Sequence, residues 1–138
     1  MLSQLVYVSN RHASCTEEEI RNILDSCKRN NPVSQITGIL LYSEAKFIQM
    51  VEAEAKVVAA LYDKIKADKR HSGAVMISYG PIKEKSFPGW HMGVRKIAES
   101  EVDFKTSITK EEREVYSSLL NGREEDGMKV LAMLKKFF

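Results

Sequence analysis

Two apolar runs joined by a short polar connection constrain the fold more than any other feature of the chain. The runs cover residues 36–42 and 46–52, and Ser43, Glu44 and Ala45 lie between them. A connection this short suits a hairpin of antiparallel strands. The sequence therefore predicts the second and third strands of a sheet in this region.

The first strand is predicted near the N-terminus, over residues 4–9. This segment is rich in β-branched and aromatic side chains. Alternation along a strand puts Leu5 and Tyr7 on one face and Val6 and Val8 on the other. Apolar side chains on both faces indicate a buried strand.

Two amphipathic helices are expected around the hairpin. The first begins with a capping box formed by Thr16 and Glu19, and should span about 17–29, where an Asn-Asn-Pro sequence is expected to stop it. The second is expected over about 54–68, where apolar residues recur on one face.

Residues 74–82 and 91–97 predict a fourth and a fifth strand. The first six elements then follow the ferredoxin-like order, strand-helix-strand-strand-helix-strand. We therefore predict an α+β fold, a ferredoxin-like βαββαββ sandwich whose five-stranded mixed sheet carries two helices on one face. The other face needs cover.

Two C-terminal helices can provide that cover. Thr109 and Glu112 form a second capping box for a helix that should end near Leu120. The last helix is marked by Met128, Leu131, Leu134 and Phe138. Because so few residues cannot bury an independent core, we expect a domain over 1–98 and a helical extension over 99–138, packed on the sheet or on another subunit.

Composition and cysteine usage argue against several classes of protein. The formal charge is only +2, so no single-sign field indicates a nucleic acid or a membrane partner. Cys15 and Cys27 lack metal-ligand spacing, and His12, His71 and His91 share no local pattern with acids, so no metal site is expected. The chain has no signal sequence and no long apolar stretch, which favours a cytoplasmic location.

Gln49 is the anomaly in the predicted third strand. Alternation places it on one face with Phe47 and Val51, while Ile48 and Met50 face the other way. A buried amide without a partner costs about 1–3 kcal/mol, so Gln49 must find partners inside the fold. From spacing alone, a satisfied core amide and a functional amide explain it equally well.

Tyr7 and Asn31 also have structural explanations. A phenol in the middle of a strand is often a core side chain bonded to a carbonyl. The pair Asn30 and Asn31 before Pro32 suits a helix end, because Asn tolerates left-handed geometry and the residue before proline avoids the helical region. Neither residue identifies a function by itself.

Four motifs together resemble the BLUF family of flavin-binding blue-light sensors. They are LVYVS at 5–9, NN at 30–31, ITGILLYSEAKFIQMVE at 36–52 and FPGWHM at 87–92. The resemblance covers about residues 3–97. The chain departs from the family pattern at Ala53, where E-G-E is common, and at Gln35, where a small or polar turn residue precedes ITG. Ala53 implies that a left-handed backbone is not required at this position or is reached at some cost.

The resemblance implies an FAD site, with FMN left open as an alternative. In the family, the equivalents of Tyr7, Asn31 and Gln49 line a slot between the two helices that holds the isoalloxazine ring. An asparagine amide complements the pyrimidine edge of a flavin, which presents an N–H donor and carbonyl acceptors. Ile23 and Ile65 are expected to form apolar walls.

Four further residues complete the expected cofactor site. Asn30 belongs to the Asn-Asn motif, and Lys64, Arg70 and His71 fall where the family often has basic residues near the flavin O2 or the phosphates. The alternative for the sequence DKRH at 68–71 is a solvated helix end, where the helix dipole favours cations.

The resemblance also implies a mechanism. The excited flavin takes an electron, with a proton, from Tyr7, and Gln49 is left with rearranged hydrogen bonds through rotation or a shift to its imidic tautomer. Trp90 and Met92, on strand five, pass this change to the C-terminal helices. The sequence leaves open which of the two points inward.

We therefore expect a blue-light photoreceptor without enzymatic activity. The chain ends about 40 residues after the fifth strand, which leaves no room for a cyclase, so a short, stand-alone member with an unidentified downstream protein is expected. Family analogy implies a homo-oligomer, for which the apolar faces of the last two helices offer a surface. The alternatives are a flavin-dependent redox enzyme and a ferredoxin-like module for a nucleic acid or a small metabolite.

Overall fold

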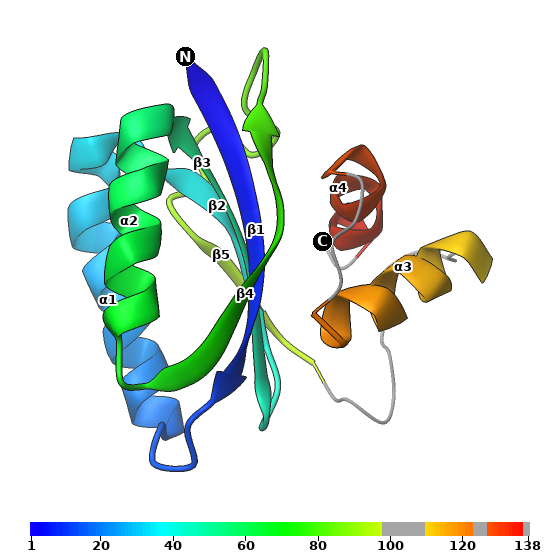
Figure 1. Ribbon diagram of the computed structural model, residues 1–138. Helices are drawn as coiled ribbons and strands as arrows, with labels where there is room; N and C mark the ends of the chain where they lie inside the picture. The colour runs from blue at the N-terminus through cyan, green and yellow to red at the C-terminus, as the bar shows by residue number, and fades with distance from the viewer. Residues whose placement is uncertain (98–109, 123–126, 137–138) are drawn as a thin grey trace.

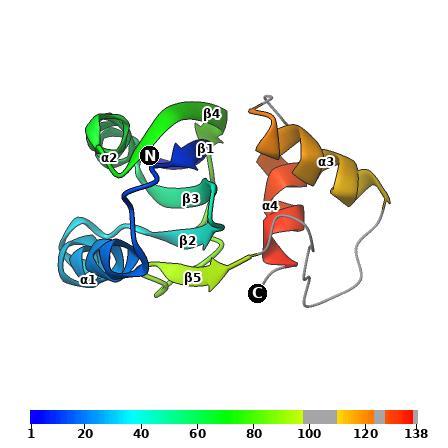
Figure 2. The same cartoon turned by 90° about the horizontal axis from the view of Figure 1, so that it is seen from below.

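A computed structural model describes residues 1–97, 110–122 and 127–136. A five-stranded sheet lies between two pairs of helices, α1 and α2 on one face and α3 and α4 on the other (Figures 1 and 2). The strands are β1 (Leu2–Arg11), β2 (Thr37–Tyr42), β3 (Lys46–Glu54), β4 (His71–Pro81) and β5 (Gly93–Lys96). The helices are α1 (Glu17–Ser34), α2 (Ala55–Ala67), α3 (Lys110–Leu120) and α4 (Gly127–Lys135).

The strands follow the order β4-β1-β3-β2-β5 across the sheet. The pairs β4–β1, β1–β3 and β3–β2 are antiparallel, whereas β5 runs parallel to β2. This arrangement confirms the predicted α+β, ferredoxin-like fold with a mixed sheet. Among the interior strands, β1 and β3 are neighbours, and their register sets Tyr7 directly opposite Gln49.

Side-chain alternation sends neighbouring residues of the central strands into different layers. Val6 and Val8 of β1, with Ile48 and Met50 of β3, belong to a core formed with α3 and α4. Leu5, Tyr7 and Val51 pack on the opposite face with residues of α2. The predicted faces of both strands are therefore confirmed.

The described C-terminal helices cover the sheet of their own chain. Their contribution to this core consists of Val115, Tyr116, Leu119, Val130, Met133 and Leu134. These apolar faces pack against the sheet and are therefore not the free oligomer surface that we expected, although the Met128 side chain is 83% exposed. Thr109 and Phe138, two residues of the predicted helix patterns, lie outside the described residues, and the division into two domains stays a prediction.

The predicted end of the first helix was wrong, because α1 continues through Asn30, Asn31 and Pro32 to Ser34. Pro32 in the last turn has no backbone N–H to donate, but the carbonyls at the end of the helix are capped by another residue. Gln35 adopts the left-handed conformation, and its backbone N–H donates to the Asn31 and Pro32 carbonyls. The Asn-Asn-Pro sequence therefore belongs to the helix and precedes its cap.

The predicted start of the fifth strand was also wrong, because β5 begins at Gly93. The residues before it bond elsewhere: the Gly38 N–H donates to the Trp90 carbonyl at 2.9 Å, and the Asn31 amide donates to the His91 carbonyl. Trp90 and Met92 consequently lie in the connection that leads into β5 and are not part of the strand.

Candidate functional site

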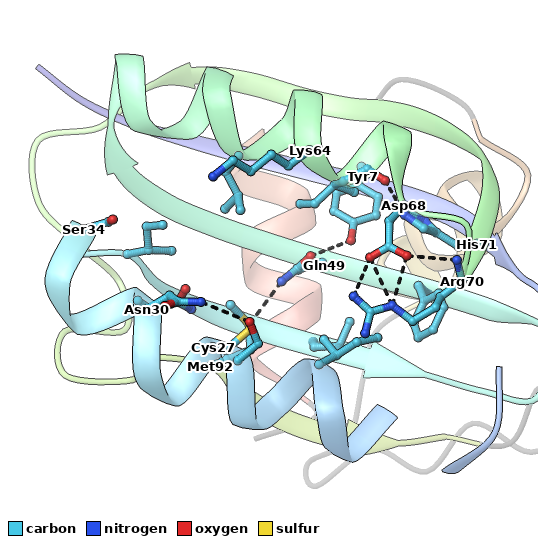
Figure 3. A pocket seen from close by; sticks show the side chains of 18 residues that line it. Tyr7, Cys27, Asn30, Ser34, Gln49, Lys64, Asp68, Arg70, His71 and Met92 are labelled. Carbon is cyan, nitrogen blue, oxygen red and sulfur yellow. Dashed lines mark hydrogen bonds and ion pairs between the residues drawn. The ribbon is translucent and has the colours of Figure 1, made fainter. Parts of the chain in front are cut away.

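A cavity of about 350 Å³ lies between the sheet and the helices α1 and α2 (Figure 3). This volume is within the range of about 300–1,000 Å³ typical of small-molecule sites. Its lining combines apolar walls with polar side chains from β1, β3, α1 and α2 and from residues 68–71, which follow α2. Among the described residues, no group of three or more metal-binding side chains was found, and no helix is both long and apolar enough to cross a membrane.

Tyr7 and Gln49 form the polar centre of the cavity floor. They are 4% and 7% exposed, and the Tyr7 hydroxyl donates a hydrogen bond of 2.5 Å to Gln49 Oε1. The amide nitrogen of Gln49 donates toward Met92 Sδ at 3.4 Å. Contacts at both ends of the amide define its orientation, because sulfur accepts a hydrogen bond and the phenol donates one.

Burial is the main cause that raises the pKa of Tyr7 above its ordinary value. Cys27 and Asp68 act in the same direction, since a negative charge on either group disfavours a phenolate beside it. The folded protein therefore keeps Tyr7 neutral and able to donate. The Tyr62 ring packs beside it at a centroid distance of 5.8 Å.

Asn31 reaches the cavity from the last turn of α1. It is 5% exposed, and its amide nitrogen donates to the His91 carbonyl at 2.5 Å. This bond ties the helix to the connection that carries Met92. Asn30 also lines the cavity but is solvent-exposed, and its amide donates to the Ser26 hydroxyl at 3.1 Å.

The three predicted basic residues all line the cavity, with Lys64 and Arg70 at different ends of it (Figure 3). The Asp68 carboxylate accepts from Arg70 Nε and Nη2, and the Arg70 guanidinium lowers the pKa of that carboxyl. His71 uses both ring nitrogens, one with the Ser9 hydroxyl at 2.6 Å and one with the Ile65 carbonyl at 2.5 Å. Arg70 and His71 thus already bind protein groups.

Apolar side chains form the walls. The predicted Ile23 and Ile65 line the cavity from α1 and α2, and Leu40 and Phe47 add to it from the sheet. Sequence reasoning singled out only the two isoleucines, because isolated aliphatic residues are core residues in any fold.

Several polar residues of the site were missed, notably Ser26, Cys27 and Ser34 on α1. With Ile23, Asn30 and Asn31 they form a stripe at the three- and four-residue spacing of one helix face. Extending the helix pattern past residue 29 would have found the stripe. Burial raises the pKa of the Cys27 thiol, while a hydrogen bond from Asn31 acts in the opposite direction. Asp68 gave no sequence signal of its own.

Trp90 and Met92, which were predicted to pass the change at Gln49 to the C-terminal helices, point in different directions. Met92 lines the cavity and contacts the Gln49 amide. Trp90 is 42% exposed and packs against Phe87 at a centroid distance of 5.2 Å, with its ring over Gly93. The structure therefore places Met92 inward and Trp90 outward.

The comparison with family models matches one family over residues 2–93, described as sensors of blue-light using FAD, BLUF. Photoactivated adenylate cyclase subunit beta of Euglena longa is 32% identical over 87 residues, which are 63% of this chain and 10% of the relative. The blue light- and temperature-regulated antirepressor BluF of Escherichia coli (strain K12) is 31% identical over 85 residues, 60% of this chain and 21% of the relative. The chain thus spans only a small part of these curated relatives.

Among solved structures, the dark state of BlrB, a BLUF protein, superimposes with a TM-score of 0.73 and 26% sequence identity. The match covers 99% of this chain and 93% of that chain. A bacterial light-regulated adenylyl cyclase matches with a TM-score of 0.68 and 29% identity, over 100% of this chain and 37% of its own.

Proposed function

The chain belongs to the BLUF family of blue-light sensors that use FAD, and on that premise we propose that light rearranges the hydrogen bonds of Tyr7 and Gln49 and that a partner protein reads the change. The observation that carries the proposal is the buried bond from the Tyr7 hydroxyl to Gln49 Oε1 at the floor of a ligand-sized cavity. A redox-active phenol and a reversible amide are the residue types that such a switch needs.

The cavity suits an isoalloxazine ring. Ile23 and Ile65 provide apolar surfaces on the helix side, and Asn31 and Gln49 provide amides on the polar side. Each amide has further donor and acceptor capacity beyond the bonds that it makes within the protein, because an amide carries two N–H groups and two lone pairs. FAD is the proposed cofactor, and Lys64 is the basic residue best suited to one of its oxygens or phosphates.

Bound FAD would absorb blue light and, once excited, accept an electron. Tyr7 is the proposed donor, since a phenol is oxidisable and its proton already points at Gln49 Oε1. Loss of an electron would make the phenol proton strongly acidic, and Gln49 is placed to accept it. Return of the electron and the proton to Tyr7 would restore the phenol, with no net reduction of the flavin. Rotation of the Gln49 amide, or a shift to its imidic tautomer, then exchanges donor and acceptor within the cavity.

The same rearrangement changes the contact between Gln49 and Met92. Rotation turns the amide oxygen toward Met92 Sδ, where no hydrogen is available for a bond, so the present N–H···S contact is lost. We propose that the connection carrying Met92 and Trp90 moves in response and alters the packing beneath α3 and α4. A downstream protein, a homo-oligomeric state and a cytoplasmic location remain parts of this proposal.

A sensor is favoured over a flavin-dependent enzyme by the state of the acid at the cavity. Asp68 lines it, but its carboxylate is held by Arg70, which lowers its pKa and leaves it unsuited to take a proton from a substrate near neutral pH. The cyclase activity in the names of relatives belongs to proteins of which this chain matches only a part.

The decisive experiment is to purify the protein with FAD and record its absorption before and after blue light. We expect a yellow protein with a small, reversible red shift and no net flavin reduction. A colourless protein after FAD reconstitution would remove both flavin functions. Bleaching with an electron donor, together with substrate turnover, would instead support the enzyme.

A further inference from the structure

Glu52 is a buried carboxylate that the proposed photochemistry does not use. It lies on β3, three residues after Gln49, and it is 0% exposed. Alternation along β3 points Gln49 into the cavity and Glu52 toward the face covered by α3 and α4. Burying a carboxylate is costly unless it is well hydrogen-bonded, so its partners indicate what it holds in place.

Three donors surround this carboxylate. Glu52 Oε1 accepts from the Phe87 backbone N–H at 2.7 Å and from the Thr37 hydroxyl at 3.0 Å. Glu52 Oε2 accepts from the Ser86 backbone N–H at 2.9 Å. Two of the three donors therefore belong to consecutive backbone groups in the connection between β4 and β5.

That connection, the 86–92 segment, passes from one face of the sheet to the other. At its start, the Phe87 side chain is buried in the core beneath α3 and α4. At its end, Met92 lines the cavity and contacts Gln49. Between them, the Trp90 carbonyl accepts from the Gly38 N–H and the His91 carbonyl accepts from Asn31.

Gly38 shows how closely the segment is held against the sheet. Its φ is +155°, and a Cβ atom there would lie 2.0 Å from the Met50 carbonyl oxygen. Only glycine therefore allows the β2 backbone to approach β3 here while its N–H bonds to Trp90. The segment is held near both of its ends, and at its start Glu52 accepts the two backbone hydrogen bonds from Ser86 and Phe87. Hydrogen bonds to a carboxylate are stronger than those between neutral groups.

We propose that Glu52 is a positioning residue, the fixed anchor about which the 86–92 segment moves when Gln49 releases Met92. With Ser86 and Phe87 held, a displacement that begins at Met92 is confined to the part of the segment next to Trp90. The anchor also resists that displacement, which favours the return of Met92 to Gln49. Glu52 thereby influences how long the light-induced state lasts.

The first test is residue-resolved hydrogen exchange by NMR on the wild-type protein loaded with FAD, in darkness and under blue light. We expect the Ser86 and Phe87 amides to remain protected in both states, while amides between Gly89 and Met92 exchange faster in light. Equal loss of protection at Ser86 and Phe87 would overturn the fixed anchor.

The second test compares Glu52→Gln with the matched control Thr37→Val. Gln keeps one acceptor but turns an amide N–H₂ toward one of the two backbone donors, which loosens the segment. Thr37→Val removes the third donor and leaves both attachments to the segment in place. We expect Glu52→Gln to slow dark recovery by about fivefold, the scale of one lost hydrogen bond, and Thr37→Val to change it by less than about twofold.

Equal recovery rates in the two variants would show that Glu52 only stabilises the fold. The recovery measurement rests on the proposed light response. A third measurement is independent of it: the rate of hydrogen exchange at the Ser86 amide in the FAD-free proteins. There, Glu52→Gln should exchange about tenfold faster than Thr37→Val. If the wild type shows no light response but Ser86 exchanges faster in Glu52→Gln than in Thr37→Val, the proposed function is wrong and the anchoring role of Glu52 is supported. If Ser86 exchanges equally fast in the two variants, the anchoring role is wrong whatever the light response.

Discussion

The two faces of the central sheet are built from the same strands but do opposite things. Ile48 and Gln49 are neighbours on β3, yet Ile48 enters the closed core under α3 and α4, whereas Gln49 enters the cavity under α1 and α2. Val6 and Tyr7 show the same division on β1. One face is filled with side chains of the chain itself, and the other is left hollow with polar groups at its floor.

This difference separates stability from ligand chemistry. Close packing on the α3 and α4 face contributes most to the stability of the fold where side chains such as Met50 and Leu119 are completely buried. A cavity on the opposite face forfeits such contacts, and its amides and phenol must be paired to avoid a penalty. The closely packed face therefore supports the strands that place Tyr7 and Gln49 at the cavity.

The sharpest way to break this comparison is a pair of substitutions one residue apart. We expect Gln49→Leu, on the hollow face, to abolish the reversible red shift completely while FAD still binds, because no amide remains to exchange donor and acceptor. Met50→Leu, on the closed face, should retain the shift since it nearly conserves volume. Illuminated difference spectra of both variants measure the effect, and a normal shift in Gln49→Leu would contradict the assignment.

Truncating one isoleucine on each face should affect mainly the free energy of unfolding on the closed face and mainly FAD binding at the cavity. Ile48→Ala is expected to lower the free energy of unfolding by about 2–5 kcal/mol through loss of burial and a residual cavity. Ile23→Ala, at the cavity wall, should cost about 1 kcal/mol or less without ligand but weaken FAD binding, because the site is already open there. Urea unfolding of the apo-proteins and FAD titration separate these effects. Similar unfolding costs in both variants would mean that the hollow face is packed as firmly as the closed one.

The two adjacent asparagines allow a smaller test on α1. Asn31→Ala removes a buried donor to the His91 carbonyl and should cost about 1–2 kcal/mol in stability and roughly tenfold in FAD affinity. Asn30→Ala removes a solvent-exposed bond to Ser26 and should change both by less than about half as much. Equal losses of FAD affinity would show that the orientation of the α1 stripe does not distinguish the two amides.

The smallest expected effect is a pH dependence from Tyr7. Its pKa in the folded protein is above the ordinary value of 10.0, so its contribution is fully present below that pH and declines above it, where the unfolded chain ionises and the folded one does not. From about pH 10 upward, the unfolding free energy of the wild type should fall more steeply than that of Tyr7→Phe, by up to about 1.4 kcal/mol per pH unit. Parallel urea curves for both proteins across this range would show that Tyr7 ionises normally when folded.

The sequence predicted what depends on periodicity. Alternation separated Tyr7 from Val6 on the first strand and Gln49 from Met50 on the third. The register that sets Tyr7 opposite Gln49 is a pairing of β1 with β3, and the sequence did not predict it. The order of strands and helices predicted the ferredoxin-like sheet. These features follow from local patterns that tertiary contacts reinforce.

The remaining features depend on contacts between distant segments. Asn31 and Pro32 read as a helix stop locally, but a left-handed Gln35 cap and the bond to His91 extend α1 and bring a further turn to the cavity. The role of Glu52 was equally invisible, because its partners Ser86 and Phe87 lie more than thirty residues away. The direction of Met92 required the same long-range connection.

The central claim is that the phenol of Tyr7, held against Gln49 in the hollow face, initiates the light response. The most direct test is the light-minus-dark absorption spectrum of wild type and Tyr7→Phe, both loaded with FAD and recorded side by side. We expect a reversible red shift in the wild type and none in Tyr7→Phe, with FAD bound and the fold intact in both. A reversible shift of normal size and lifetime in Tyr7→Phe would contradict it.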